Sequence, residues 1–309
     1  MRIVVHGQQA FGKAVLEALL ERGDDVVAVY AAPGRPGGKA DPLAEAATEA
    51  GLPVFQPATF RDPEVHDAFR ALAPDLQVMA FVTVVVPESF LTIPTHGTIQ
   101  YHPSLLPRHR GRSAINWPVI EGETETGLTV FWPDAGLDTG DVLLQKATPI
   151  GPDETLGTVY FERLFPLGVE ALLEAVDLVA AGNAPRLKQD DGLATYEGPC
   201  ERASARVDWG KPWRQIHDLV RGCDPQPGAW TTFGDAVVQL YGTAPRPARD
   251  LAGLGGAPGE VVDVSAQGIA VACADGRITV SRVKPAGSGK LPAAEWAAGA
   301  GLGPGARLG

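Results

Sequence analysis

Hydrophobic positions near the N-terminus follow two alternating periods. Arg2–His6 and Asp25–Ala31 are short runs rich in β-branched residues, which favours strands. Between them, apolar side chains recur three or four positions apart, as on one face of a helix, and Gly23 follows as a helix end. The apolar positions of this helix are Val15, Leu16, Leu19 and Leu20. A strand, a helix and a second strand in this order predict a parallel sheet with right-handed crossovers.

The alternation of strands and helices continues through the first half of the chain. Leu76–Val86 is so strongly apolar that it predicts a buried central strand running into a loop, and Gly97–Tyr101 predicts the next strand. Further strands are expected at Pro53–Phe55, Gly127–Phe131 and Val142–Lys146. Helices are expected at Asp41–Ala50, Glu64–Ala71, Pro87–Leu91 and Ser113–Glu121. Asp153–Ala181 has the period of a long helix, which Pro166 and Gly168 should kink or break.

The pattern changes after Gly182, where a polar stretch follows that we interpret as a linker. Beyond it, short strands separated by turn residues predict a small antiparallel barrel. The expected strands are Val207–Trp209, Gly228–Phe233, Val237–Tyr241, Gly259–Val264, Gly268–Ala274 and Arg277–Val283, with one helix at Pro212–Arg221. We therefore predict an α/β fold of two domains. Residues 1–200 would form a Rossmann-like parallel-sheet domain, and residues 201–309 a small OB-like β-barrel.

Net charge bears on the class of partner. The net charge of the chain is −11, and the negative charge is concentrated in residues 1–199, which hold 14 Lys and Arg against 27 Asp and Glu. Residues 200–309 hold 12 against 10, so their surplus of positive charge is small. Nucleic-acid binders usually carry a strong basic patch. The charge therefore disfavours DNA or tRNA as a partner, without excluding tRNA.

Other features of the composition narrow the class of protein further. The three cysteines, Cys200, Cys223 and Cys273, are scattered, which argues against a disulfide framework or a metal site. No apolar run approaches the roughly 20 residues that span a membrane. The N-terminus lacks the layout of a signal peptide, so a cytoplasmic protein is expected. The pattern says nothing about oligomeric state.

Gly7 ends the first expected strand and opens a G-x-x-x-x-G turn that closes at Gly12. This is not the G-x-G-x-x-G turn of dinucleotide-binding folds, and no acidic residue ends the second strand, so NAD binding is rejected. Gly7 and Gln8 are candidate substrate-binding residues, because ligands of such folds bind at the carboxyl edge of the sheet. The alternative is a tight turn that contacts no ligand.

Two polar loops carry the candidate chemistry. His102 leaves an expected strand and enters the loop HPSLLPRHRG, and a histidine there can act as a general base or acid. Asp138 lies in GLDTGD, between two expected strands. Taken alone, His102 is better explained by a structural backbone hydrogen bond. Asp138 and its rival carboxylates Asp134 and Asp141 are explained by turn chemistry. Together with the Gln100 amide, His102 and Asp138 form a plausible set for moving an acyl group.

The two loops resemble a known family. Gln100–Gly111 followed by Gly136–Asp141 is similar to the formyltransferases that use 10-formyltetrahydrofolate, and the similarity runs through the whole chain. Ser113–Trp117 and Thr195–Gly198 are most similar to the hydrolase domain of 10-formyltetrahydrofolate dehydrogenases. The resemblance implies His102 as the catalytic histidine and Asp138 as the catalytic aspartate.

The same resemblance implies roles for neighbouring residues. Gln100 stands where the family's transferases have an oxyanion-binding Asn and the dehydrogenase's hydrolase domain has an apolar residue, so it is a candidate oxyanion donor. Folate should lie along two segments. The residues expected to bind it are Phe81, Val82, Val86, Pro87, Asp134, Ala135, Gly136 and Leu137. Arg108 and Arg110 are candidates for an anionic substrate, with a solvated or salt-bridged loop as the equal alternative.

The resemblance implies an enzyme with 10-formyltetrahydrofolate as co-substrate and no metal. Our first hypothesis is formyl transfer to a small-molecule amine. The second is hydrolysis to tetrahydrofolate and formate, although a chain ending at Gly309 has no room for the further domains of the dehydrogenase. The third is formylation of methionyl-tRNA, which the acidic charge disfavours. A folate-binding sensor is the non-enzymatic alternative, and the presence of both His102 and Asp138 argues against it.

Overall fold

The computed structural model describes residues 1–34, 37–246 and 256–309, except for the side chains of residues 245 and 246. The chain divides into two compact units. The N-terminal unit comprises Met1–Ala114, Gly127–Thr148 and Phe161–Glu197, and the C-terminal unit comprises Ile115–Thr126, Pro149–Tyr160 and Gly198–Gly309. This differs from the expected single boundary at residue 200. Two early segments belong to the C-terminal unit, where the Asn116 amide donates to the Gly222 carbonyl and Gly157 N–H to the Asp224 carbonyl.

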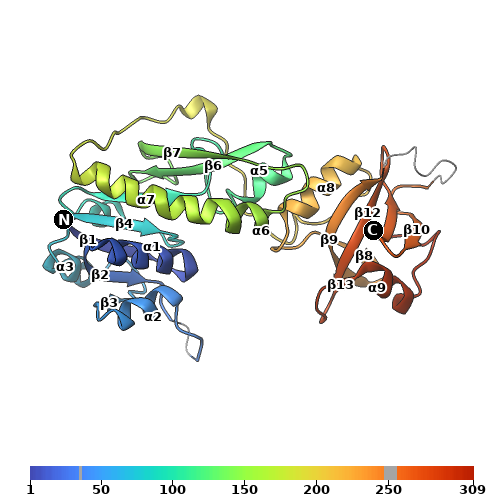
Figure 1. The fold of residues 1–309 in the computed structure, drawn as a ribbon, viewed down its shortest axis with the longest axis horizontal. Coiled ribbons are helices and arrows are strands. Elements are labelled where there is room, and N and C mark those ends of the chain that lie inside the picture. Colours follow the sequence, from blue (N-terminus) through green and yellow to red (C-terminus); the bar gives the residue numbers. More distant parts are fainter. Residues whose placement is uncertain (35–36, 247–255) are drawn as a thin grey trace. The chain divides into compact units, whose positions relative to one another are not determined.

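The N-terminal unit is built on one seven-stranded sheet with the order β3-β2-β1-β4-β5-β6-β7 (Figure 1). Its strands are β1 (Arg2–Gly7), β2 (Asp25–Ala31), β3 (Val54–Phe55), β4 (Leu76–Ala80), β5 (Thr98–His102), β6 (Glu125–Phe131) and β7 (Val142–Pro149). The strands from β3 to β5 pair in parallel, whereas β5 pairs antiparallel with β6. The expected parallel α/β sheet is confirmed, and an antiparallel edge is added to it.

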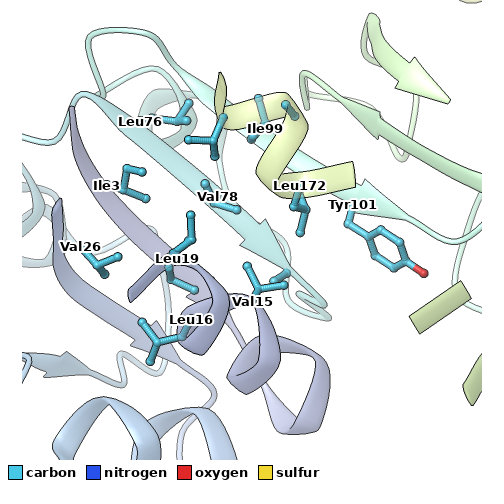
Figure 2. Close-up of a cluster of buried hydrophobic side chains, with 14 of the residues drawn as sticks. Ile3, Val15, Leu16, Leu19, Val26, Leu76, Val78, Ile99, Tyr101 and Leu172 are labelled. Atoms are coloured by element: carbon cyan, nitrogen blue, oxygen red, sulfur yellow. The ribbon is translucent and has the colours of Figure 1, made fainter. Parts of the chain in front are cut away.

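Helices cover both faces of this sheet because successive strand residues point to opposite sides. One face packs against α1 (Gln9–Arg22), α2 (Pro42–Glu49) and α7 (Phe165–Ala180). Figure 2 shows part of this core, which contains Ile3 of β1 together with Leu16 and Leu19 of α1. The opposite face is aromatic and packs against α3 (Pro63–Ala71) and α4 (Glu88–Leu91). Its buried residues are Val4, Ala28, Tyr30, Phe60, Phe69 and Phe90.

The long helix expected at Asp153–Ala181 is three pieces. A short α6 (Leu156–Val159) and a π-helical turn (Tyr160–Leu164) precede α7. The expected interruption at Pro166 is found, because α7 begins at Phe165 with Pro166 in its first turn, whereas α7 continues through Gly168 without a break. Gly168 is instead the place where α7 approaches the sheet closely. Among the described residues, no helix is both long and apolar enough to cross a membrane.

The C-terminal unit contains an antiparallel sheet with the order β10-β11-β12-β9-β8, and β13 pairs with β12. Its strands are β8 (Trp230–Phe233), β9 (Ala236–Arg246), β10 (Val261–Ser265), β11 (Gly268–Ala272), β12 (Arg277–Pro285) and β13 (Leu291–Pro292). Its helices in the described residues include the short α6, α5 (Asn116–Ile120), which is shorter than expected, α8 (Trp213–Gly222) and α9 (Ala293–Ala300). The expected antiparallel character is confirmed. Apolar residues of α8, α9 and the sheet share one core.

Candidate active site

His102 is the last residue of β5, at the carboxyl edge of the parallel strands. The strand is anchored on both sides, because Met79 of β4 pairs with Gln100 and Thr129 of β6 pairs with His102. The imidazole is buried. A buried histidine on a central strand is held rigidly, and the carboxyl edge is where ligands bind in open α/β sheets.

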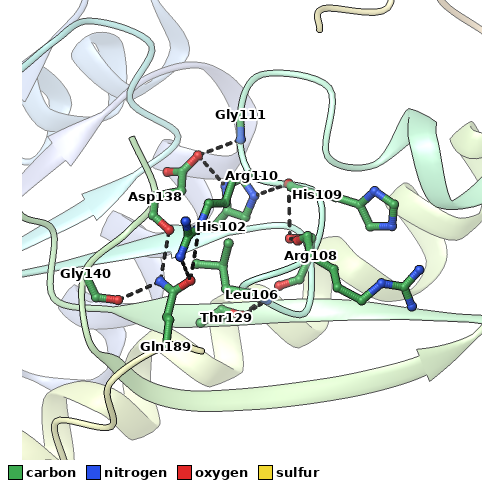
Figure 3. Close-up of polar contacts among 11 residues, drawn as sticks. His102, Leu106, Arg108, His109, Arg110, Gly111, Thr129, Asp138, Gly140 and Gln189 are labelled. Carbon is green, nitrogen blue, oxygen red and sulfur yellow. Dashed lines mark hydrogen bonds and ion pairs between the residues drawn. The ribbon is translucent and has the colours of Figure 1, made fainter. Parts of the chain in front are cut away.

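Both ring nitrogens of His102 face oxygen atoms (Figure 3). Nε2 lies 2.9 Å from the carbonyl oxygen of His109, and Nδ1 lies 3.5 Å from Oδ2 of Asp138. A carbonyl only accepts hydrogen bonds, so Nε2 must carry a hydrogen and donate it. In the neutral ring, Nδ1 is therefore the unprotonated nitrogen. It is the atom that can take or release a proton, beside a buried carboxylate.

Asp138 is fixed in its loop between β6 and β7 by contacts to its side chain and its backbone. Its Oδ2 accepts a hydrogen bond of 2.8 Å from Gly111 N–H, in the loop that follows His102. Its backbone has a φ of +56°, in the left-handed region that is unfavourable for a residue with a side chain. Its carbonyl accepts a hydrogen bond of 2.9 Å from the Gln189 amide. The structure thus brings the two predicted catalytic residues together, although they lie far apart in the sequence.

The His102–Gly111 loop is shaped by internal hydrogen bonds. Ser104 Oγ donates to the Arg108 carbonyl at 2.6 Å, which closes the turn. Thr129 of β6 donates to the Ser104 carbonyl and accepts from Leu106 N–H. These contacts direct the His109 carbonyl toward His102. The motif HPSLLPRHRG is therefore largely a scaffold for one imidazole.

Gln100 lies two residues before His102 on β5, so the two side chains are on the same face of the strand. It is half-buried. Within the described part of the chain, its side-chain amide has no hydrogen-bond partner, unlike the Gln145 and Gln189 amides nearby. Its two N–H donors are therefore available to a ligand at the carboxyl edge of the sheet.

The segment expected to contact folate after β4 presents apolar surface. Phe81 has a φ of +64° and an exposed ring, and Val85 is also exposed. Val86 packs on the aromatic core, and Pro87 provides the backbone start of α4. The segment thus combines an anchored end with an exposed apolar stretch.

The second expected folate segment, Asp134–Leu137, is a tight turn. Asp134 Oδ1 accepts hydrogen bonds from Gly136 N–H and Thr139 Oγ1, so this carboxylate is committed to the turn. Ala135 and Gly136 form the exposed turn itself, and the Leu137 side chain is exposed beside Asp138. The turn therefore presents backbone groups and the Leu137 side chain to a ligand.

A pocket of about 240 Å³ opens at the ends of β1, β2 and β4. Gly7, Gln8 and Val82 line it, as does His6, whose burial lowers its pKa to about 3 and keeps it neutral. Gly7 is required because a Cβ there would lie 2.2 Å from the Ala80 carbonyl oxygen. The start of α1 is already neutralised, since Gln9 N–H donates to the Asp41 carboxylate. This pocket therefore suits a polar ligand better than an anion at the helix end.

The two arginines of the loop differ in their surroundings. Arg108 is exposed. Arg110 donates to Gln189 Oε1 and to Asp191 Oδ1, both at 2.8 Å, so its guanidinium is bound within the protein. Of the two interpretations of Arg110, the structure shows the salt-bridged loop.

Sequence reasoning missed the residues that support the site from the stretch after α7. Gln189, Thr195 and Glu197 all contact the His102 or Asp138 loops. Gln189 lies in the polar stretch interpreted as a linker, where no periodicity marks a buried residue. Thr195 and Glu197 lie just beyond it, in the segment Thr195–Gly198, whose signal was the family resemblance and not a contact with the site.

Comparison with known proteins matches both parts of the chain. A family model described as "Formyl transferase" matches residues 1–176, and one described as "Formyl transferase, C-terminal domain" matches residues 200–301. Methionyl-tRNA formyltransferase of Geobacter sulfurreducens is 43% identical over 314 residues, covering 100% of this chain and 97% of that protein. Cytosolic 10-formyltetrahydrofolate dehydrogenase of Xenopus tropicalis is 45% identical over 249 residues, covering 79% of this chain but only 28% of that protein.

Solved structures share the fold at low sequence identity. HypX from Aquifex aeolicus in complex with tetrahydrofolic acid has a TM-score of 0.68 and 22% identity, over 96% of this chain and 47% of that one. WlaRD, a sugar 3N-formyl transferase, has a TM-score of 0.69 and 16% identity, over 93% of this chain and 98% of that one. These similarities establish the fold alone. The resemblance expected from the sequence is confirmed by the family matches and by the relatives.

Proposed function

The chain belongs to the formyl transferase family, and from that premise we propose that it transfers the formyl group of 10-formyltetrahydrofolate to an amino group. The observation that carries the proposal is the buried pair His102 and Asp138, 3.5 Å apart at the carboxyl edge of the sheet. Formyl transfer needs a group that removes a proton from the attacking amine and returns one to the leaving nitrogen. An imidazole beside a carboxylate meets that need.

The two loops around the site suit a folate. Phe81 and Val85 after β4, and Leu137 beside Asp138, are large apolar side chains left exposed. Exposed apolar groups next to convergent polar groups are typical of small-molecule sites. Backbone groups would make most of the remaining contacts. They belong to Val82, Val86 and Pro87 on one side and to Asp134, Ala135 and Gly136 on the other. Bound there, 10-formyltetrahydrofolate would supply the formyl group.

The protein's own groups have separate roles in the reaction. His102 Nδ1 accepts the proton of the attacking amine, while Nε2 stays bonded to the His109 carbonyl and keeps the ring oriented. Asp138 balances the charge of the imidazolium that results, and the same proton can then pass to the leaving nitrogen. The Gln100 amide donates to the oxyanion that forms on the formyl oxygen. Removing one oxyanion donor typically costs about 10²–10³-fold in kcat.

The acceptor is the finer part of the proposal. Relatives named methionyl-tRNA formyltransferase match the full length of both chains, which favours the amino group of methionyl-tRNA. The net charge of −11 favours a small-molecule amine instead. We place methionyl-tRNA first, because similarity over the whole chain includes the C-terminal unit and overall net charge does not locate a binding surface.

A second candidate function is hydrolysis of 10-formyltetrahydrofolate to tetrahydrofolate and formate. Two observations favour it. Relatives named 10-formyltetrahydrofolate dehydrogenase are 45% identical over 79% of this chain. Water is also small enough to reach the formyl carbon without any acceptor pocket. In this reaction, His102 would take a proton from water rather than from an amine.

One assay separates the candidates. The protein is incubated with 10-formyltetrahydrofolate alone, with charged initiator tRNA, and with small primary amines, and tetrahydrofolate and formylated product are measured. We expect formylated methionyl-tRNA and slow turnover without an acceptor. A formylated product that forms with a small amine but not with charged tRNA would show that the acceptor is a small amine. Turnover that is as fast without any amine as with one would establish hydrolysis. Turnover that survives in His102→Ala would refute the proposed site in every case.

A further inference from the structure

Gln189 lies in the polar stretch after α7, yet its side chain is buried, at 7% exposure. Its amide nitrogen donates to two carbonyls of the Asp138 loop, that of Asp138 at 2.9 Å and that of Gly140 at 2.7 Å. Its amide oxygen accepts from Nε and from a terminal nitrogen of Arg110, at 3.2 and 2.8 Å. Figure 3 shows the amide between the two loops.

This amide is fully used. A glutamine side chain offers two donor hydrogens and an oxygen with two lone pairs, and Gln189 engages all four. No other side chain of this length combines two donors with an acceptor. A glutamate would place oxygen against the two carbonyls, and a leucine would leave both carbonyls and Arg110 without their bonds. The site therefore specifies glutamine chemically.

The two carbonyls that Gln189 binds belong to the strained residue Asp138 itself and to Gly140, two residues after it. Asp138 has a φ of +56°, a conformation that costs a residue with a side chain free energy and persists only when surrounding contacts determine it. The Gln189 amide supplies such contacts at the carbonyl of Asp138 and in the backbone that follows it. From that conformation, the Asp138 carboxylate reaches Gly111 N–H at 2.8 Å and faces His102 Nδ1 at 3.5 Å.

Gln189 also connects the loop of Asp138 to the loop of His102. Arg110, which the amide oxygen binds, directly precedes Gly111, whose N–H binds the Asp138 carboxylate. Without the Gln189 amide, the two loops would no longer be connected at this point. The Asp138 carboxylate and the Gly111 N–H that binds it could then shift relative to one another. Shifts of about 1 Å in a catalytic group can cost on the order of 100-fold in rate.

We propose that Gln189 is a positioning residue that holds the Asp138 carboxylate opposite His102 Nδ1. The inference rests on the catalytic role proposed for that pair, and it adds a residue from a segment that the sequence did not mark. Gln189 touches no reacting atom, so it acts only through Asp138. Loss of its amide should lower kcat and change the pH dependence of kcat, because the imidazole loses its aligned partner. It should leave the KM for 10-formyltetrahydrofolate nearly unchanged.

The test uses Gln189→Leu and the isosteric Gln189→Glu in the full-length protein. Each should lower kcat by about tenfold to 100-fold. Asp191→Asn is the matched control. Asp191 binds the same Arg110 guanidinium, but its side chain is 75% exposed and it makes no recorded hydrogen bond to the Asp138 loop. Its kcat and pH profile should stay within about twofold of wild type, as expected for an exposed ion pair.

A double-mutant cycle distinguishes positioning from a general structural role. In a protein that already carries Asp138→Asn, adding Gln189→Leu should lower kcat by less than about twofold further, because the carboxylate that Gln189 positions is already gone. If Gln189→Leu lowers kcat by the same factor in that background as in the wild type, the inference is overturned. An unchanged pH profile in both Gln189 variants would overturn it as well. If Gln189→Leu does not fold, the cycle is carried out with Gln189→Glu, which preserves the volume of the side chain. If His102→Ala remains active, the proposed function fails; if only the Gln189 cycle fails, the proposed function stands and this inference does not.

Discussion

The two nitrogens of the His102 imidazole face oxygen atoms of different charge. Nε2 binds the neutral carbonyl of His109, and Nδ1 faces the carboxylate of Asp138. The 2.9 Å hydrogen bond to the carbonyl requires a hydrogen on Nε2, which leaves Nδ1 as the nitrogen that can exchange a proton in the neutral ring. Both oxygens belong to residues with positive φ, +54° at His109 and +56° at Asp138. Such conformations cost about 1–3 kcal/mol each and are concentrated at functional sites.

At the residue scale, we predict that His102→Ala and Asp138→Ala each lower kcat by at least about 100-fold while the protein stays folded. His102→Ala removes the proton acceptor, and Asp138→Ala removes the group that balances its charge. The measurement is steady-state formyl transfer with thermal melting of each variant. Gln100→Leu, which removes only the amide, should lower kcat by about 10²-fold or more if that amide serves the oxyanion.

His96→Gln is the control for this series, because His96 is an exposed histidine outside the two catalytic loops. It should retain the activity of the unmodified protein. Near-normal activity of His102→Ala or Asp138→Ala would mean that the reacting atoms lie elsewhere.

At the scale of elements, the close approach of α7 to the sheet depends on one glycine. A Cβ at Gly168 would lie 2.7 Å from Cε2 of Tyr101 and 3.0 Å from the ring of Phe11. Tyr101 is the residue before His102 on β5. The sequence pattern indicated Gly168 as a helix breaker, because periodicity alone does not reveal what a helix packs against.

We therefore predict that Gly168→Ala destabilises the protein, because overpacking costs about 1–3 kcal/mol. The roughly 1 kcal/mol that alanine normally gains over glycine inside a helix offsets only part of that cost. The free energy of unfolding, measured by urea titration, decides the sign. Gly299→Ala in α9 is the matched control, because nothing lies within 4 Å of a Cβ placed there. That variant should stabilise the protein, and the same sign in both variants would contradict the packing argument.

The segment after α7 shows the limit of reading elements from sequence. Its first part, residues 183–192, was expected to be a linker, and Thr195–Gly198 was marked only by the family resemblance. Yet Thr195 Oγ1 accepts from His109 N–H, and Glu197 lies 3.2 Å from His109 Nδ1. Gln189 binds the Asp138 loop from the same segment. A polar stretch with no regular period looks the same in sequence whether it is solvated or buried against a site. Only the long-range contacts distinguish the two.

At the scale of the whole molecule, pH should act on stability through buried neutral histidines. Burial lowers the pKa of His6 to about 3, and its ring accepts a hydrogen bond from the Gln77 amide. In the unfolded chain, a histidine has a pKa of about 6.5. Below that pH, the unfolded state binds a proton that the folded state does not. Stability is therefore fully present above about pH 6.5 and falls progressively toward pH 3.

We predict that His6 alone reduces the free energy of unfolding by about 2 kcal/mol between pH 7 and pH 5. Urea unfolding at the two pH values measures the difference. His6→Asn, which keeps an acceptor for Gln77, should lose that part of the pH dependence. His96→Asn, at an exposed position, should retain it. Equal pH dependence in the wild type and His6→Asn would show that His6 does not stay neutral in the folded state.

The sequence by itself determined the alternation of strands and helices in the N-terminal unit, the antiparallel character of the second unit and the family, but it predicted a strand at Val207–Trp209 that is not formed and did not predict β13 or α9. Those features depend on local periodicity and on motifs in which neighbouring residues act together, as from His102 to Gly111. Tertiary structure alone decided that His102 Nδ1 meets Asp138 and that Gln189 supports it. It also decided that Gly168 is a contact and that two early segments belong to the C-terminal unit. Each of these depends on residues that are distant in the chain, and chain order does not specify which distant groups will share a desolvated site.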